Sequence, residues 1–137
     1  PPRLRRIGPI RRPVGHMHIL IIEDDLLMAL DIEACLERMG LRSSDFASSE
    51  DNALKLAGLR RPDLIISDVR LAQGNGPEAV RRIRAHHGFI PCIYVTGNPD
   101  VARAADPDAG IIVKPMNWPD LTDIVSAIAL VPERLAS

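Results

Sequence analysis

Short apolar runs of strand length, each ended by a polar, glycine or proline residue, constrain the fold of this chain more than any other feature. They lie at His18–Ile22, Leu64–Ser67, Cys92–Val95 and Ile111–Val113, and a weaker run lies near Arg42–Ala47. The apolar character of the stronger runs is continuous rather than alternating, which is typical of strands buried on both faces of a parallel sheet. The sequence therefore predicts a parallel sheet that is covered by helices.

Segments with helical periodicity separate these runs. The clearest apolar stripe, spaced i, i+3, i+4 and i+7, consists of Leu121, Ile124, Val125 and Ile128. Further helices are expected over residues 28–39, 50–60 and 79–87, while Pro99 and Pro107 limit the helix between the last two runs to about two turns. The alternation predicts one α/β domain: a doubly wound (βα)5 flavodoxin-like sandwich with five parallel strands in the order 2-1-3-4-5.

Charge divides the chain into two parts. Residues 1–16 contain five arginines, four prolines and no acid, which predicts a basic, disordered tail before a folded domain over residues 17–137. Because these arginines contribute +5 to a net charge of −1, residues 17–137 carry −6. The folded part therefore lacks the basic surface that a nucleic-acid-binding domain needs.

Cysteine use and hydropathy indicate the compartment. Cys35 and Cys92 have neither metal-ligand spacing nor a disulfide framework around them, so we expect two buried thiols in a reducing compartment. No apolar run is long enough to span a bilayer, and the N-terminus lacks the apolar stretch of a secretory signal. We therefore expect a cytoplasmic protein without a membrane partner.

Acidic, hydroxyl and basic residues stand where the predicted strands end. Glu23 and Asp24 follow the first strong run, Asp68 follows the second, and Thr96 and Lys114 follow the third and fourth. Acids at strand ends are often helix caps, and Asp24 or the following Asp25, taken singly, fits that role best. In the order 2-1-3-4-5, however, the strands before the acids are neighbours at the topological switch point, where open α/β sheets bind ligands. Three carboxylates that repel one another suit a hard divalent cation, and the adjacent hydroxyl and ammonium groups suit a phosphoryl group.

With these residues the chain resembles the receiver domain of two-component response regulators, as in chemotaxis regulators, over residues 17–130. Five motifs in the expected order carry the resemblance: Glu23-Asp24, Ser67-Asp68-Val69-Arg70, Gly74-Asn75-Gly76, Thr96-Gly97 and Lys114-Pro115. The resemblance implies that Asp68 is the phosphoacceptor, which attacks the phosphorus of a phosphohistidine on a partner kinase. It also implies a site for Mg²⁺, or Mn²⁺ in its place, made by Asp24, Asp68, Glu23 and the backbone carbonyl of Arg70.

The resemblance implies that Thr96, Gly97 and Lys114 bind the phosphoryl group and take part in the switch, and that Pro115 has the structural role of aiming Lys114. Such a domain signals rather than serving as an enzyme, since it catalyses only its own phosphorylation and dephosphorylation. Its donor would be a sensor histidine kinase or a histidine phosphotransfer protein. The output partner is not specified, and a homodimer is compatible with the family. The sequence leaves open whether the chain is a stand-alone regulator or the receiver of a larger protein.

Two departures from the family pattern fall on its switch. Ile111 stands where receivers usually carry Tyr or Phe, and the interval from Thr96 to Lys114 is short. The string from Tyr94 to Gly97 resembles the Phe-Ala-Thr-Gly motif of the proteobacterial receiver subfamily nicknamed FAT GUY. We hypothesise that phosphorylation orders residues 97–110, with Tyr94 taking part.

Two other functions compete with the phosphoacceptor. The first is a receiver used as a scaffold without phosphorylation, which has no need for the complete set of acids with Thr96 and Lys114. The second is an aspartyl phosphatase of the haloacid dehalogenase type. That class needs a second Asp two residues after the nucleophile, where this chain has Arg70.

Overall fold

The computed structural model describes the backbone of residues 16–136 and the side chains of residues 16–128. The predicted basic tail, residues 1–16, lies outside the described residues except for His16.

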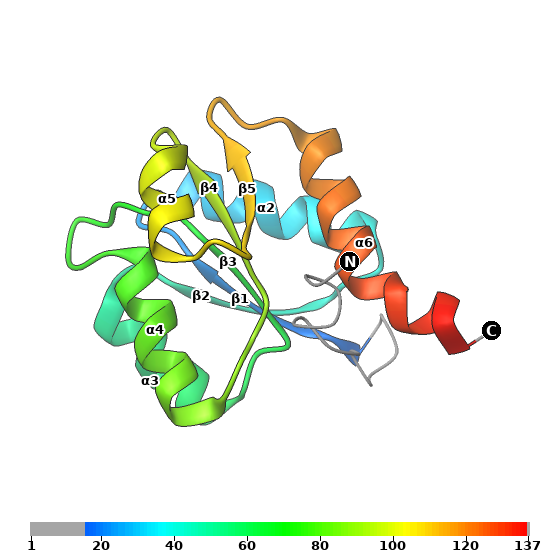
Figure 1. Ribbon diagram of the computed structural model, residues 1–137, viewed down its shortest axis with the longest axis horizontal. Helices are drawn as coiled ribbons and strands as arrows, with labels where there is room; N and C mark the ends of the chain where they lie inside the picture. Colours follow the sequence, from blue (N-terminus) through cyan, green and yellow to red (C-terminus); the bar gives the residue numbers. More distant parts are fainter. Residues whose placement is uncertain (1–15, 137) are drawn as a thin grey trace.

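Five parallel strands form one sheet in the order β2-β1-β3-β4-β5, as predicted (Figure 1). The strands are β1 (His18–Ile22), β2 (Ser43–Ala47), β3 (Leu64–Ser67), β4 (Cys92–Thr96) and β5 (Gly110–Val113). The helices that follow them in turn are α2 (Leu26–Arg38), α3 (Glu50–Leu59), α4 (Gly76–His87), α5 (Pro99–Ala105) and α6 (Trp118–Ala136). The fold is therefore the doubly wound (βα)5 sandwich that the sequence predicts.

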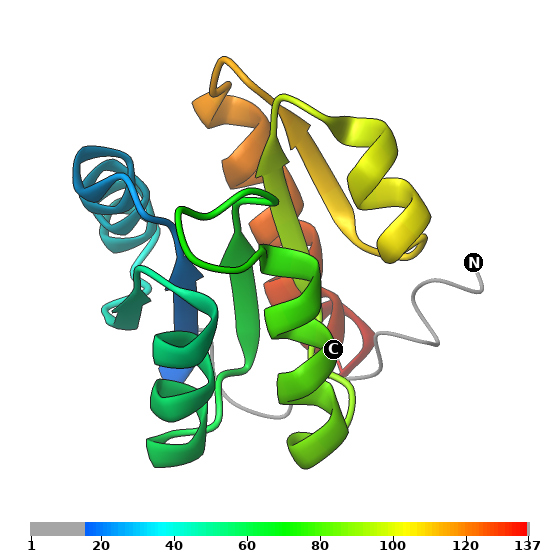
Figure 2. The same cartoon turned by 90° about the vertical axis from the view of Figure 1, so that its left-hand side faces the viewer.

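Helices cover both faces of the sheet, with α2 and α6 on one face and α3, α4 and α5 on the other (Figure 2). The inner strand β1 shows why its sequence is apolar throughout: Ile19 and Ile21 pack toward α2 and α6, while Leu20 and Ile22 pack toward the opposite helices. All five residues of β1 are buried. A strand that is buried on both faces cannot alternate between apolar and polar residues.

The main difference from the expected elements is the start of α4, which begins at Gly76, three residues before the predicted range 79–87. The Asn75 side chain accepts a hydrogen bond of 2.8 Å from the N–H of Glu78, and Pro77 occupies the first turn, where its missing N–H costs nothing. The polar start of α4 has no apolar stripe, so periodicity alone places the helix too late.

The His18 side chain links the edge strand β2 to β1 through hydrogen bonds. Its buried ring contacts the Ser43 hydroxyl through Nδ1 and the Asp45 carboxylate through Nε2, each at 2.8 Å. These contacts occupy both ring nitrogens at the amino end of β1, away from the acids at its carboxyl end. A structural role for His18, rather than a metal-binding one, follows.

Both cysteines are free and buried, as expected. Burial raises the pKa of the Cys92 thiol well above its ordinary value, so the thiol stays protonated and unreactive. Within residues 16–136, none of the helices has the combination of length and apolar character that crossing a membrane requires.

Candidate functional site

The acids after β1 and β3 converge, because the two strands are direct neighbours. Ile22 pairs with Ser67 at the carboxyl ends of the strands, and the N–H of Asp68 donates to the carbonyl of Ile22 at 2.9 Å. Glu23, Asp24 and Asp68 each offer a carboxylate oxygen that lies within 4.8 Å of the others. The structure therefore brings together the three carboxylates that strand order alone predicted to meet.

Lys114 completes this cluster from the end of β5. Its backbone N–H donates to the carbonyl of Thr96 at 2.9 Å, which directs the side chain over the carboxyl ends of the strands. Its Nζ lies 3.0 Å from Oδ2 of Asp68 and 3.8 Å from Oε1 of Glu23. The peptide bond between Lys114 and Pro115 is cis. Lys114 thus acts as counter-ion to two of the three carboxylates.

The electrostatics of the cluster are those of crowded, partly buried charges. Glu23 is 2% exposed, and this burial, together with the negative charge of Asp68, raises its pKa to about 7. Partial burial works to lower the pKa of Lys114, but its hydrogen bond to Asp68 and the surrounding carboxylates outweigh that effect and raise it. Lys114 is therefore held charged, while the protonated form of Glu23 is favoured more than for an exposed glutamate.

Carboxylate donors of this kind fit a hard divalent cation. Oδ2 of Asp24 accepts the N–H of Ala72 at 2.6 Å, and Oδ1 of Asp68 accepts the N–H of Val69 at 2.7 Å. Arg70, whose carbonyl is the expected fourth ligand, lies in the loop between β3 and α4 and forms an antiparallel bridge with Asn75. The loop and the carboxylates are therefore linked through main-chain N–H groups.

Thr96 is the last residue of β4 and is buried, with its hydroxyl engaged by its own loop rather than by Asp68. Its Oγ1 accepts the N–H of Asn98 at 2.8 Å, immediately before α5. The intervening Gly97 is exposed. Tyr94, two residues earlier, is fully buried and pairs across the sheet with Ile111. The ring that receivers usually carry on β5 is thus present one strand away, on β4.

One feature of the site, the contact of Gly76 with Asp68, was missed by sequence reasoning. Gly76, which belongs to the motif Gly74-Asn75-Gly76, packs so closely on Asp68 that a Cβ would overlap the Asp68 carbonyl oxygen. The sequence signal for the Gly76 contact was the pair of glycines around Asn75, in the loop that follows β3 and Asp68. Asp25 is the N-cap of α2 and accepts the N–H groups of Leu27 and Met28, which is one of the two roles that an acid at this strand end can have.

A five-stranded parallel sheet in this order, with acids beyond β1 and β3, defines a doubly wound α/β protein with its site at the topological switch point. The family model described as the response regulator receiver domain matches residues 19–126. The chain belongs to this family of receiver domains of two-component response regulators.

Named relatives agree with this assignment. The chain is 34% identical over 113 residues to the phyllosphere-induced regulator PhyR of Methylorubrum extorquens, which covers 79% of this chain and 42% of PhyR. It is 32% identical over 120 residues to the transcriptional regulatory protein PdtaR of Mycobacterium tuberculosis, covering 85% of this chain and 57% of PdtaR. The chain thus spans about half the length of these curated relatives.

The fold is similarly shared. A CheY-like response regulator receiver domain from Methylobacillus flagellatus superposes with a TM-score of 0.72 at 25% identity, covering 82% of this chain and 98% of that one. Receiver domains are signalling domains that generally bind Mg²⁺ through acidic residues and interact with histidine kinases or phosphotransfer proteins. The family predicted from the sequence is confirmed, whereas the placement in the FAT GUY subfamily stays a prediction.

Proposed function

We propose that this chain accepts a phosphoryl group on Asp68 from the phosphohistidine of a sensor histidine kinase or a histidine phosphotransfer protein, in a Mg²⁺-dependent reaction. The observation that carries the proposal is the convergence of three carboxylates within 4.8 Å, with the Lys114 ammonium 3.0 Å from Asp68. In the transfer, a carboxylate oxygen of Asp68 forms a bond to phosphorus while the bond from phosphorus to the histidine nitrogen breaks. The nitrogen keeps the electron pair and takes a proton from solvent.

Each residue of the site has a part in this reaction. Asp24, Asp68 and Glu23, with the backbone carbonyl of Arg70, would hold Mg²⁺. The bound ion would screen the attacking carboxylate and stabilise charge on the transferred group. Lys114 would leave its pairing with Asp68 for a phosphoryl oxygen.

The output of such a site would run through Thr96, Gly97 and α5. The Thr96 hydroxyl now accepts the N–H of Asn98, and Asn98 gives α5 no side-chain cap. If Thr96 turns its hydroxyl to a phosphoryl oxygen, that N–H loses its partner and the amino end of α5 rearranges around the phosphoryl group. At the other end, Asp106 is held at 2.8 Å by Arg84 of α4. Phosphorylation is therefore expected to move the first turn of α5 more than its last.

The phosphoryl donor has an apolar surface beside the acids on which to dock. Leu26, Leu27 and Leu30, in the first turns of α2, expose 56%, 74% and 48% of their surfaces. α2 begins two residues after Asp24, so these leucines follow the acidic pair closely in the chain. We infer that these leucines contact the donor protein. Substituting all three by serine should weaken transfer from the kinase while leaving phosphorylation by a small-molecule donor unchanged.

The proposal is tested by incubating the chain with acetyl phosphate and Mg²⁺ and measuring the intact mass. A metal-dependent adduct on Asp68 supports it. Steady release of phosphate at enzyme-like rates would instead favour the aspartyl phosphatase, and a chain that stays unmodified would favour the scaffold.

A further inference from the structure

The loop between β3 and α4, residues 69–75, is held from two sides. On its inner side, the N–H of Ala72 donates to Oδ2 of Asp24 at 2.6 Å. On its outer side, the N–H of Asn75 donates to Oε2 of Glu50 at 3.2 Å, and the carbonyl of Gln73 accepts the N–H of Glu50 at 3.2 Å. Glu50 is the first residue of α3, so this helix is hydrogen-bonded to the loop through both the backbone and the side chain of one residue.

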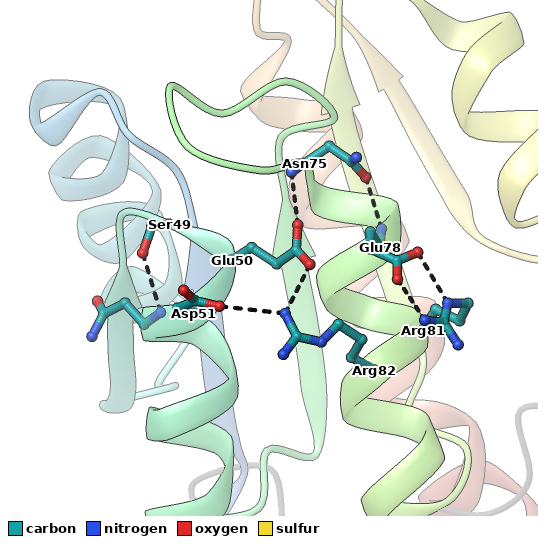
Figure 3. Close-up of polar contacts among 8 residues, drawn as sticks. Ser49, Glu50, Asp51, Asn75, Glu78, Arg81 and Arg82 are labelled. Atoms are coloured by element: carbon teal, nitrogen blue, oxygen red, sulfur yellow. Dashed lines mark hydrogen bonds and ion pairs between the residues drawn. The ribbon is translucent and has the colours of Figure 1, made fainter.

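The Glu50 side chain is itself fixed. Its Oε1 accepts from Arg82 of α4 at 2.9 Å, and only 16% of the side chain is exposed (Figure 3). The loop makes room for it at Gly74, which has a φ of +86° and where a Cβ would lie 2.5 Å from both Cβ and Oε2 of Glu50. The carboxylate therefore connects α3, α4 and the loop at one point.

The inner contact uses an oxygen of a metal-ligand candidate. If Oδ2 of Asp24 binds the cation, it accepts the Ala72 N–H less well, and loading the site then weakens the inner hold on the loop. The outer contacts, from Glu50 to Asn75 and Gln73, do not involve a metal ligand and would persist when the metal binds. The loop also carries Arg70, whose carbonyl is the expected backbone ligand.

We propose that Glu50 is a positioning residue for the metal site: it keeps the β3–α4 loop in the geometry that presents the Arg70 carbonyl once Asp24 has turned to Mg²⁺. This inference rests on the proposed function. Loss of the Glu50 contacts should lower Mg²⁺ affinity, because the loop that carries the Arg70 carbonyl would then be less well fixed, an effect comparable to the loss of outer partners of metal ligands.

The test measures Mg²⁺ affinity by titration calorimetry, and amide exchange of Asn75 by NMR, in the full chain. In Glu50→Ala we expect affinity about tenfold weaker and faster exchange at Asn75. Asp51→Ala is the matched control, because Asp51 is also an acid of the first turn of α3 and also contacts Arg82, at 3.4 Å. It is 93% exposed and, among the described side chains, accepts no hydrogen bond from the loop. The Mg²⁺ affinity of the Asp51→Ala chain should stay within about twofold of wild type.

Glu50→Gln guards against a folding defect, since it keeps the length of the side chain but offers one carbonyl oxygen to two donors. We expect an intermediate loss of affinity at an unchanged melting temperature. Equal losses in the Glu50→Ala and Asp51→Ala chains would overturn the inference, because charge alone would then explain them. Unchanged affinity in Glu50→Ala, with wild type binding Mg²⁺, would overturn the inference only. A wild-type chain that binds no Mg²⁺ would overturn the proposed function as well.

Discussion

The ammonium group of Lys114 lies 3.0 Å from the carboxylate of Asp68, although 46 residues separate them in the chain. Among the described side chains, Lys114 is the cation that contacts the nucleophile, and it competes with Mg²⁺ for it. Replacing it by methionine removes this competition, so Lys114→Met should bind Mg²⁺ more tightly, by about tenfold. The same variant should be phosphorylated more slowly, because no ammonium meets the incoming phosphoryl group.

Calorimetry and the rate of adduct formation check the two halves of this prediction. Arg103→Met is the control, since Arg103 pairs on the surface with Asp100 and lies outside the acidic cluster. Weaker Mg²⁺ binding by the Lys114→Met chain would contradict the assigned arrangement.

Glu23 should make the metal-free protein less stable as the pH rises. Its folded-state pKa of about 7 lies above the ordinary value of 4.5, so between these values the folded chain binds more protons than the unfolded chain. The free energy of unfolding should therefore fall as the pH increases through this window, by about 2 kcal/mol. Mg²⁺ should offset the loss above pH 7 by binding the ionised carboxylate.

Urea unfolding at pH 5 and pH 8, with and without Mg²⁺, measures this dependence. The Glu23→Gln chain, which cannot titrate at this position, should lose most of the difference between the two pH values. If the wild-type chain instead became more stable from pH 5 to pH 8, and the Glu23→Gln chain showed the same pH dependence, Glu23 would not be held protonated.

The pair between Arg84 and Asp106 should be the most costly ion pair to break outside the site. Arg84 donates to Asp106 at 2.8 Å and twice to the carbonyl of Ile90, and Asp106 is only 6% exposed. Arg84→Met leaves a buried carboxylate without its partner, which should cost about 3–5 kcal/mol of unfolding free energy. The matched surface change Arg103→Met should cost less than about 1 kcal/mol. Chemical denaturation measures both, and equal costs would show that the buried pair contributes no more than the exposed one.

Phosphorylation should alter the amino end of α5 in preference to its carboxyl end. With beryllofluoride as a phosphoryl mimic, we expect amide exchange to change most over residues 97–102, where Thr96 gives up the N–H of Asn98. Residues 106–110, next to the Arg84 contact, should change less. Hydrogen exchange with mass spectrometry resolves the two segments. Unchanged protection across 97–110 would refute the proposed switch.

The strands and the acidic cluster were predictable because simple rules connect them to the sequence. Burial on both faces makes β1 and β3 continuous apolar runs, and parallel neighbours bring Asp24 and Asp68 to one edge. The hydrogen bonds between Glu50 and the β3–α4 loop were not predictable. They depend on how α3 and α4 pack against each other, which periodicity does not specify. The contact of Gly76 with the backbone of Asp68 was missed for a related reason: a glycine pair signals a turn but does not say what approaches it.

The most direct measurement is the intact mass of the chain after incubation with acetyl phosphate, with Mg²⁺ and with a chelator, for wild type and for Asp68→Asn. The account predicts one added phosphoryl group on wild type in the presence of Mg²⁺, and none with the chelator or on Asp68→Asn. Asp25→Asn, which alters the acid that caps α2 rather than the nucleophile, should still gain the adduct. An adduct of equal yield on Asp68→Asn, or a wild-type chain that remains unmodified with Mg²⁺, would contradict the assignment of Asp68 as the phosphoacceptor.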